Sequence, residues 1–325
     1  MRSLRFSAPK GAMYMGMQPL SHARGNLLKR LFDSVVYRAI YGLFFLLGLI
    51  PEKRAERIAE SLGGFWYQLD RRHRKVALEN LELAFGKEMS QDQIVELSRK
   101  AFDHIALVPF EMGRSLRWTK SDIDERFRIY GVHHLAKAHA KGKGTLILTC
   151  HMGNWEFLPT SMAASGFQIV AAYRPLDFAP LDRFILEMRE RFGCRMYATK
   201  KAKRGLVEEL AMGHVVGLLS DQNATKPHQG VFVDFFGKKA SAHNGMAKLA
   251  LATGAPVVPY FVARDGKYVH GEFGPEIPLV NTGDLEADVL TNTQNFSYVI
   301  ERMIRKYPEQ WFWVHRRWKT RPKDE

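Results

Sequence analysis

Two residues that can carry chemistry, His151 and Glu156, stand five positions apart in the stretch HMGNWE. On a continuous helix they would point about 140° apart, at about 100° per residue, and would not meet. The apolar run TLILTC ends just before His151, however, and Gly153 permits a turn. A helix with Asn154 as its N-cap would then return Glu156 to the imidazole. A carboxylate on one ring nitrogen leaves the other nitrogen free to accept a substrate proton, so we predict a general base, His151, oriented by Glu156.

Further polar residues follow other apolar runs of the second half of the chain. The runs TLILTC, FQIVAAY, VVGLLS and APVVPYFV are short and do not alternate with polar residues, which is typical of strands buried on both faces. They predict an α/β fold with a central, largely parallel sheet flanked by helices. Functional residues in such sheets gather beyond the carboxyl ends of the strands. Arg174 follows FQIVAAY, and Asp221 with Gln222 follows VVGLLS.

The remaining elements divide the chain into three parts. Residues 1–30 mix basic and turn-forming residues without the apolar segment of a secretory signal, and we expect a flexible tail. Residues 31–51 are expected to form a membrane-associated helix. Residues 52–325 are expected to form one α/β domain, with helices in 52–117, where apolar residues recur every three or four positions, and the sheet in 142–325.

The expected membrane helix contains the most apolar window of the chain, residues 35–50. Arg38 interrupts this window and Pro51 ends it, so it falls short of the about 20 residues of a comfortable membrane span. Basic residues flank it on both sides and give no inside-outside asymmetry. We expect it to dip into the cytoplasmic leaflet, with a full span or a buried core helix as alternatives.

Charge and cysteine content narrow the class of partner. Lys and Arg number 48 against 34 Asp and Glu, a formal charge of +14, which favours nucleic acid, a membrane surface, or an acidic substrate or carrier. Two cysteines provide neither a disulfide framework nor a four-cysteine metal site, and they fit a reducing cytoplasm. The stretch WFWVHRRWKTRPK has the composition of a single-strand nucleic-acid site. We favour instead a final strand, Trp311 to Val314, with its cations and those of RRHRK facing acidic headgroups or lipid phosphates.

Cys150 is the alternative nucleophile, because a thiol beside a histidine could accept an acyl group. Neighbouring side chains of a strand point to opposite faces, so Cys150 is expected to point away from the site that His151 serves. His214 and His243 are expected to be ordinary loop or surface residues.

The stretch HMGNWE resembles the His-x4-Asp/Glu motif of the glycerolipid acyltransferase superfamily, in the form found in bacterial lipid A late acyltransferases, the lauroyl and myristoyl transferases. The resemblance covers about residues 30 to 320. The other stretches that carry it are ENLELAFG, YRP, SDQN, GVFVDFFGKKA, AKLALATGAPVVP and PEQWFWVHRRWK.

The resemblance implies an enzyme on the cytoplasmic face of the inner membrane. It would move a fatty acyl group from an acyl-carrier-protein thioester to a hydroxyl of a lipid A precursor, as a monomer, without a metal, another cofactor or nucleic acid. His151 would be the base and Glu156 its orienting carboxylate, while Arg174 would bind a phosphate or steady the oxyanion. Substrate-binding roles are implied for Asn154, Arg174, Asp221 and Gln222.

Three other functions stay open from the sequence. A lysophospholipid acyltransferase would use a simpler acceptor. An acyl-thioester hydrolase would use water in place of the lipid. A non-catalytic nucleic-acid or membrane-binding protein would not need His151.

Overall fold

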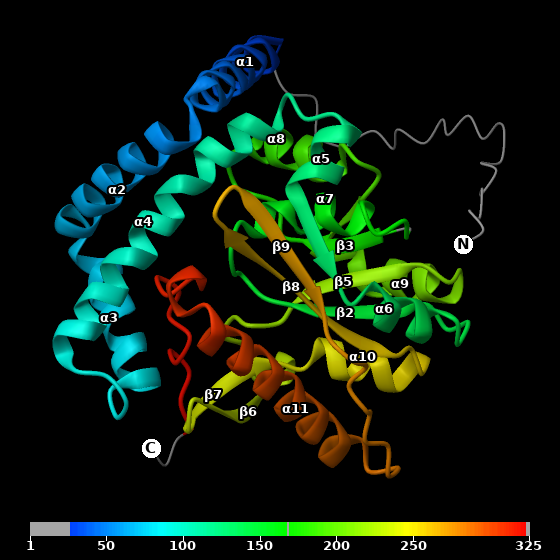
Figure 1. Ribbon diagram of the computed structural model, residues 1–325. Coiled ribbons are helices and arrows are strands. Elements are labelled where there is room, and N and C mark those ends of the chain that lie inside the picture. Colours follow the sequence, from blue (N-terminus) through cyan, green and yellow to red (C-terminus); the bar gives the residue numbers. More distant parts are fainter. Residues whose placement is uncertain (1–26, 168, 323–325) are drawn as a thin grey trace, which may run out of the picture.

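A seven-stranded sheet forms the centre of the molecule in the computed structural model, which describes residues 27–167 and 169–322 (Figure 1). Its strand order is β1-β9-β8-β2-β5-β3-β4, and every neighbouring pair is parallel except β8 and β9. The predicted largely parallel sheet is therefore confirmed. The strands are β1 (Phe127–Tyr130), β2 (Thr145–Thr149), β3 (Ile169–Tyr173), β4 (Arg195–Ala198), β5 (Val215–Leu219), β8 (Val257–Asp265) and β9 (Tyr268–Phe273).

The sheet begins earlier in the chain than the predicted boundary at residue 142. β1 is a short edge strand paired only with β9, and its side chains alternate between buried and exposed. The apolar runs that reveal central strands are absent from such an edge strand.

Helices cover both faces of the sheet, as β2 illustrates. Leu146, Leu148 and Cys150 pack into the core cluster that also contains α10 and α11, whereas Ile147 packs into the cluster of α6 and α7. This alternation is the period of two expected of a strand buried on both sides. The helices of this half are α6 (Val132–His139), α7 (Leu158–Ala163), α8 (Ala179–Glu190), α9 (Thr199–Ala211), α10 (Gly245–Thr253) and α11 (Leu285–Lys306), with the 3-10 turns η1 (Trp155–Phe157), η2 (Pro227–Gln229) and η3 (Pro308–Gln310).

The first part of the described chain is helical, as predicted. α4 starts with a complete capping box between Ser90 and Gln93, which is the spacing that the sequence offers. Its long axis runs beside both α1 and α2 (Figure 1). The helices are α1 (Leu27–Leu49), α2 (Glu52–Leu69), α3 (Arg71–Phe85), α4 (Gln91–Ser115) and α5 (Lys120–Arg126).

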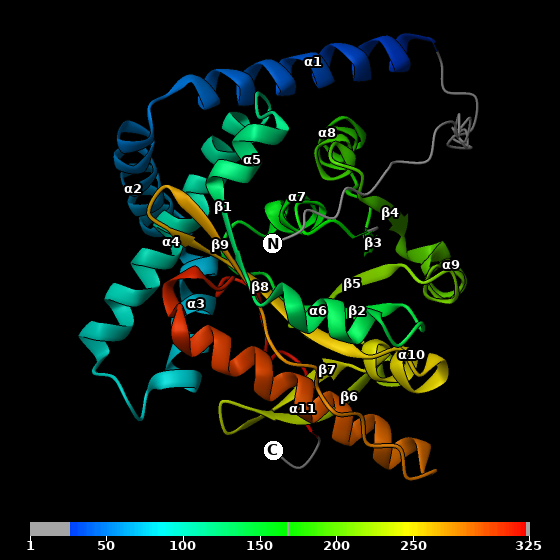
Figure 2. The ribbon, with the colours of Figure 1, turned by 45° about the vertical axis from the view of Figure 1, so that its right-hand side comes forward.

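Helix α1 lies across one end of the molecule and packs on α4 and α8 (Figure 2). Its 23 residues extend about 35 Å at 1.5 Å per residue, and the segment Lys29–Leu49 is long and apolar enough to cross a membrane. The helix starts well before the apolar window of residues 35–50, so it is longer than that window indicated, and both the expected dip into one leaflet and a full span remain compatible with its length. Only 6% of that window is buried, so α1 is a candidate membrane anchor. Of the predicted tail, residues 1–30, the part from residue 1 to residue 26 lies outside the described residues.

Close backbone contact fixes the end of α1 to α4. A Cβ atom on Gly48 would lie 2.2 Å from the carbonyl of Gly113, and one on Gly113 would lie 2.0 Å from the Phe44 oxygen. Both glycines are therefore needed for the two helices to approach this closely.

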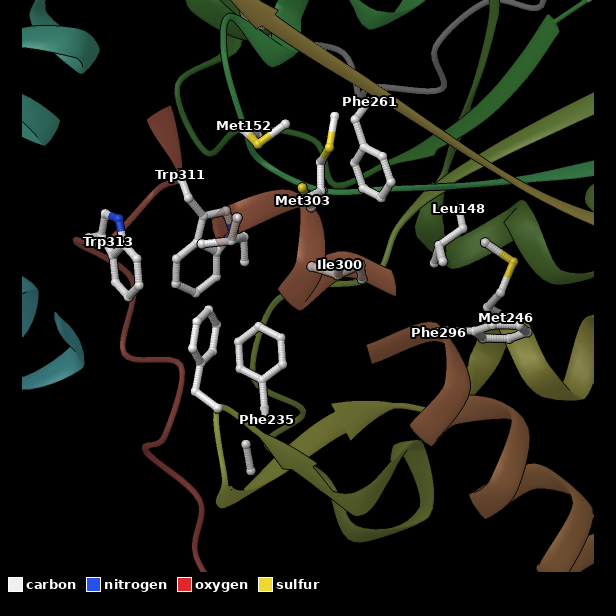
Figure 3. Close-up of a cluster of buried hydrophobic side chains, with 14 of the residues drawn as sticks. Leu148, Met152, Phe235, Met246, Phe261, Phe296, Ile300, Met303, Trp311 and Trp313 are labelled. Carbon is white, nitrogen blue, oxygen red and sulfur yellow. The ribbon is translucent and has the colours of Figure 1, made fainter. Parts of the chain in front are cut away.

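The C-terminal segment after η3 is irregular, so the predicted final strand from Trp311 to Val314 is wrong. Trp311 makes a single antiparallel bridge to Met152, and turns follow. The segment is fixed by hydrophobic burial and not by a sheet ladder. Trp311 and Trp313 are buried in the same core cluster as Phe235 of the β6–β7 hairpin (Figure 3). The hairpin consists of β6 (Gly230–Phe235) and β7 (Lys238–His243).

Candidate active site

The carboxyl ends of the adjacent strands β2 and β5 bring His151 and Asp221 together. Thr149 pairs with Leu219 in this parallel ladder, and the Ser220 amide continues it by donating to the Thr149 carbonyl at 3.0 Å. Extending the register by two residues places His151 opposite Asp221. The same strand-end rule that selected both residues in the sequence therefore also brings them into contact.

Asp221 forms hydrogen bonds with both the ring and the backbone of His151. The ring Nδ1 lies 2.8 Å from Oδ1, while Oδ2 accepts from the His151 amide at 3.0 Å and from Trp311 Nε1 at 2.8 Å. Burial alone would raise the pKa of Asp221, but the charge of His151 and these three hydrogen bonds outweigh it and lower the pKa to about 2. The carboxylate is thus ionised and accepts a hydrogen bond from Nδ1–H, which leaves the Nε2 lone pair as the basic position of the ring.

The predicted contact between His151 and Glu156 is not formed. Glu156 instead accepts two parallel hydrogen bonds from Arg189 of α8, Nε to Oε2 at 2.8 Å and Nη2 to Oε1 at 2.7 Å. After Asn154 the chain makes the short 3-10 turn η1 in place of the expected helix start, and this directs Glu156 towards α8. A bidentate guanidinium satisfies the carboxylate there, so Asp221 takes the orienting position.

The Nε2 side of His151 is partly open and lies among aromatic and amide groups. The side chain is 20% exposed, and Gln222 Nε2 lies 3.5 Å from His151 Nε2. The rings of Trp155 and Phe312 lie 5.7 Å and 6.2 Å from the imidazole and 5.1 Å from each other, measured between centroids. The basic nitrogen therefore meets one polar amide and an apolar wall.

Arg174 lies at the same edge of the sheet, just beyond β3, which pairs with β5 on the side away from β2. Its side chain is exposed and has no hydrogen-bond partner among the described residues. Two backbone amides at the start of η1 are already occupied, since Glu156 N donates to Asn154 Oδ1 and Phe157 N donates to the Asn154 carbonyl. Within the described ranges, Arg174 is therefore an unpaired cation at this edge, whereas these two amides are already bonded.

Asn154 is the N-cap of η1, as predicted, but its whole amide is used inside the protein. Its Oδ1 accepts from Glu156 N at 3.2 Å, and its Nδ2 donates to Glu111 Oε2 at 3.0 Å. The side chain is buried, so the geometry favours a role in holding the turn over the predicted contact with substrate.

A buried network braces the turn from behind, and sequence reasoning did not find it. Glu111 of α4 forms a bidentate ion pair with Arg264 of β8 at 2.6 and 2.7 Å and receives the Asn154 amide. Gln310 bonds both backbone polar groups of Arg264, and its carbonyl accepts from Gly153 N at 3.0 Å. The residues lie on elements far apart in sequence, so no local spacing reveals them.

Gly153 is the pivot of this turn. Its φ is +58°, and a Cβ atom there would lie 2.6 Å from the Val262 carbonyl oxygen. Both the backbone angle and the lack of space require glycine, as the sequence indicated.

Cys150 points into the core, as the strand argument predicted. It is 1% exposed and packs with Leu148 and Met152. Burial, with a smaller contribution from Asp221, raises the pKa of the thiol well above its ordinary value. The thiolate that covalent catalysis requires is therefore strongly disfavoured.

An oriented, partly exposed histidine at the edge of an α/β sheet, beside two aromatic rings, is suited to accept a proton. Comparison with known proteins assigns the class. Residues 29–320 match the family model described as bacterial lipid A biosynthesis acyltransferase, and the chain belongs to this family.

Individual relatives cover nearly the whole chain. The lipid A biosynthesis acyltransferase of Haemophilus influenzae is 27% identical over 87% of this chain and 88% of its own length. The lipid A biosynthesis lauroyltransferase of Escherichia coli is 29% identical over 86% and 90%, and the palmitoleoyltransferase of the same species is 25% identical over 78% and 81%. The names of the two E. coli relatives specify different acyl chains at similar identity, so the comparison leaves the chain length open.

Proposed function

We propose that this protein transfers a fatty acyl group from an acyl-carrier-protein thioester to a hydroxyl of a lipid A precursor. Family membership supports the reaction class and the acceptor. One structural observation carries the mechanism: the buried, ionised Asp221 holds Nδ1 of His151 and leaves Nε2 of a partly exposed ring beside Gln222.

In the proposed reaction, His151 Nε2 removes the proton of the acceptor hydroxyl as its oxygen attacks the thioester carbonyl. Asp221 stabilises the resulting imidazolium, and Arg174 offers a positive charge to the oxyanion. The tetrahedral intermediate then expels the carrier's thiolate, which takes the proton from the imidazolium. The ester bond forms as the thioester bond breaks, and His151 returns to its neutral form.

Glu156 takes a positioning role in this scheme, because Arg189 occupies its carboxylate. The pair fixes the turn that presents His151 and ties it to α8. Gln222 is placed to contact the attacking hydroxyl or the thioester.

The location that fits this reaction is the cytoplasmic face of the inner membrane, with α1 as the anchor and the enzyme acting as a monomer. The exposed apolar side chains of α1 and α2 supply the surface that would meet lipid. The phosphates of the acceptor and the acidic carrier account for the excess of basic residues.

The test is mass spectrometry of a tetraacylated or pentaacylated lipid A precursor incubated with the protein and mixed acyl-carrier-protein thioesters. One added acyl mass, lost in His151→Ala, is expected, and the added mass identifies the preferred chain. Full transfer by His151→Ala would disprove the mechanism. Free fatty acid without acylated lipid would indicate a hydrolase, and acylation of a lysophospholipid alone would change the acceptor.

A further inference from the structure

A strongly basic groove lies between α3 and the C-terminal segment, away from the residues of the proposed mechanism. It has a volume of about 660 Å³. Its charged lining consists of Arg72, Lys75, Arg316, Lys319 and Arg321, with Glu79 and Glu82 as the acidic members.

Most of these cations form no ion pair with the residues that the structure describes, which end at residue 322. Lys75 lies 3.7 Å from Glu79, and both side chains are largely exposed. The other four form no ion pair among the residues that the structure describes, and all of them are exposed: Arg72, Arg316, Lys319 and Arg321. A concave surface with this much uncompensated positive charge attracts an anionic partner.

The groove is close to His151 along a single short segment. Phe312, whose ring faces His151, precedes Arg316 by four residues, which limits the distance between their Cα atoms to about 14 Å even in an extended chain. An anionic partner seated in the groove would therefore lie within reach of the catalytic histidine through a long flexible arm.

Buried hydrogen bonds make the groove and the catalytic loop one rigid unit. Asn80 of α3 donates to the carbonyls of Trp313 and His315, both at 2.7 Å. Asn223, which follows Gln222, donates its amide to His315 Nε2 at 3.2 Å and exchanges side-chain and backbone bonds with Thr320. The position of the groove relative to the site is thus fixed by the fold.

The surroundings of the groove favour a protein partner over a membrane. α3 and the C-terminus lie at the opposite end of the molecule from α1 in both views (Figures 1 and 2). Neither α3 nor residues 311–322 expose a large apolar side chain, whereas α1 and α2 expose many. A lipid interface combines basic with exposed apolar residues, and the two walls of the groove, α3 and residues 311–322, supply none of the apolar half. The sequence-based expectation that these cations face headgroups is therefore not favoured.

We propose that the groove is the docking surface for the acidic face of the carrier protein that holds the acyl thioester. This inference rests on the proposed function. The carrier's prosthetic arm would run along residues 312–316 and deliver the thioester carbonyl to the Nε2 side of His151. Rim charges of this kind act mainly on association and make it salt-dependent.

The experiment uses charge reversal on the two walls separately, Arg316→Glu/Lys319→Glu and Arg72→Glu/Lys75→Glu, so that a folding defect in one variant leaves the other informative. The matched control is Lys137→Glu/Arg204→Glu, two exposed cations on α6 and α9. The expected result is a KM for the acyl carrier protein raised on the order of tenfold in both groove variants and not in the control. Transfer from acyl-pantetheine, which has no protein part, should not change in Arg72→Glu/Lys75→Glu, whose residues lie off the proposed path of the arm.

Binding of labelled carrier protein to the wild type, measured by fluorescence anisotropy against salt concentration, separates this inference from the proposed function. Weaker binding in the groove variants supports the docking surface even if no acyl transfer is detected, a result that would refute only the proposed function. An unchanged Kd and KM for the carrier would overturn the inference. A rise in the KM for the lipid acceptor, with no rise in the KM for the carrier, would also overturn the inference and would assign the groove to a lipid phosphate.

Discussion

Asp221 is the residue on which the proposed chemistry turns, and it was expected only to position substrate. The Asp221 carboxylate accepts three hydrogen bonds, two from His151 and one from Trp311, and these stabilise its ionised form. We expect Asp221→Asn to lower kcat by a factor on the order of 10² to 10⁴, because an amide can donate to Nδ1 and favour the wrong tautomer. Steady-state kinetics with circular dichroism as a folding control measures this. A variant with kcat within about threefold of the wild type would exclude Asp221 as the orienting group.

The Glu156–Arg189 pair leads to a prediction about stability. Glu156 is 10% and Arg189 21% exposed, so removing one partner leaves a mostly buried charge. Glu156→Gln should lower the free energy of unfolding by about 2–4 kcal/mol.

Arg189→Gln combined with Glu156→Gln should be less harmful than the sum of the two single changes, since no charge is left unpaired. Denaturant unfolding of the four proteins forms a double-mutant cycle. Additive losses would mean that the pair does not interact in solution.

At the scale of elements, the α2–α4 contact contains a carboxylate in an unfavourable place. Asp103 Oδ1 is buried without a hydrogen-bond partner, and α2 passes so closely that a Cβ atom on Gly63 would lie 2.3 Å from it. Burial, followed by the charges of Glu60 and Glu96, raises the pKa of Asp103 from 3.8 to about 6.

This raised pKa makes the ionised form destabilising. Because the folded-state pKa exceeds the unfolded one, stability is lost as the pH rises from about 4 through about 6 and stays lower above it. Asp103→Asn should therefore raise the free energy of unfolding at pH 8 by about 1–2 kcal/mol, after allowance for partial solvent access. The melting temperature at this pH should rise with it. Thermal melts between pH 4 and pH 8 test this, and a difference that does not widen with pH would contradict it.

The comparison of sequence with structure is also clearest at this scale. Continuous apolar runs indicate buried central strands, so β2, β3, β5 and β8 were predictable from the sequence. The rule that functional residues follow strand ends then selected His151 and Asp221. The edge strand β1 lacks such a run. The partner of His151 depends on which strand lies next to β2, and this strand order is set by long-range packing. The local spacing of the sequence does not contain that information, and it favoured Glu156 instead. The Glu111–Arg264 brace joins α4 to β8 and has no local signal at all.

At the scale of the whole molecule, α1 and α2 carry more than half of the exposed large apolar side chains among the described residues. α1 exposes Leu31, Phe32 and Leu46, among others, and α2 exposes a stripe at helical spacing, Ile58, Leu62, Phe65 and Leu69. With the basic groove formed by α3 and the C-terminal segment, the proposed roles would give the surface a lipid-facing region on α1 and α2 and a separate protein-facing region.

We expect Leu62→Ser/Phe65→Ser to weaken binding to anionic phospholipid vesicles without lowering the melting temperature, because both side chains are exposed and pack little. Leu290→Ser/Tyr298→Ser, at similarly exposed apolar positions of α11, is the matched control and should bind as the wild type does. Vesicle flotation measures the difference. Equal loss in both variants would show that α2 has no particular part in membrane contact.

The segment from Trp311 to Thr320 has a consequence for the order of events during synthesis. It supplies the Trp311 bond to Asp221, the Phe312 ring beside His151, and one wall of the basic groove. Chains emerge from the ribosome with the N-terminal part first, so α1 is available to a membrane long before this segment has been made. The proposed catalytic centre thus stays incomplete while α1 is already available to a membrane, and no activity is expected before the last segment has been made and packed.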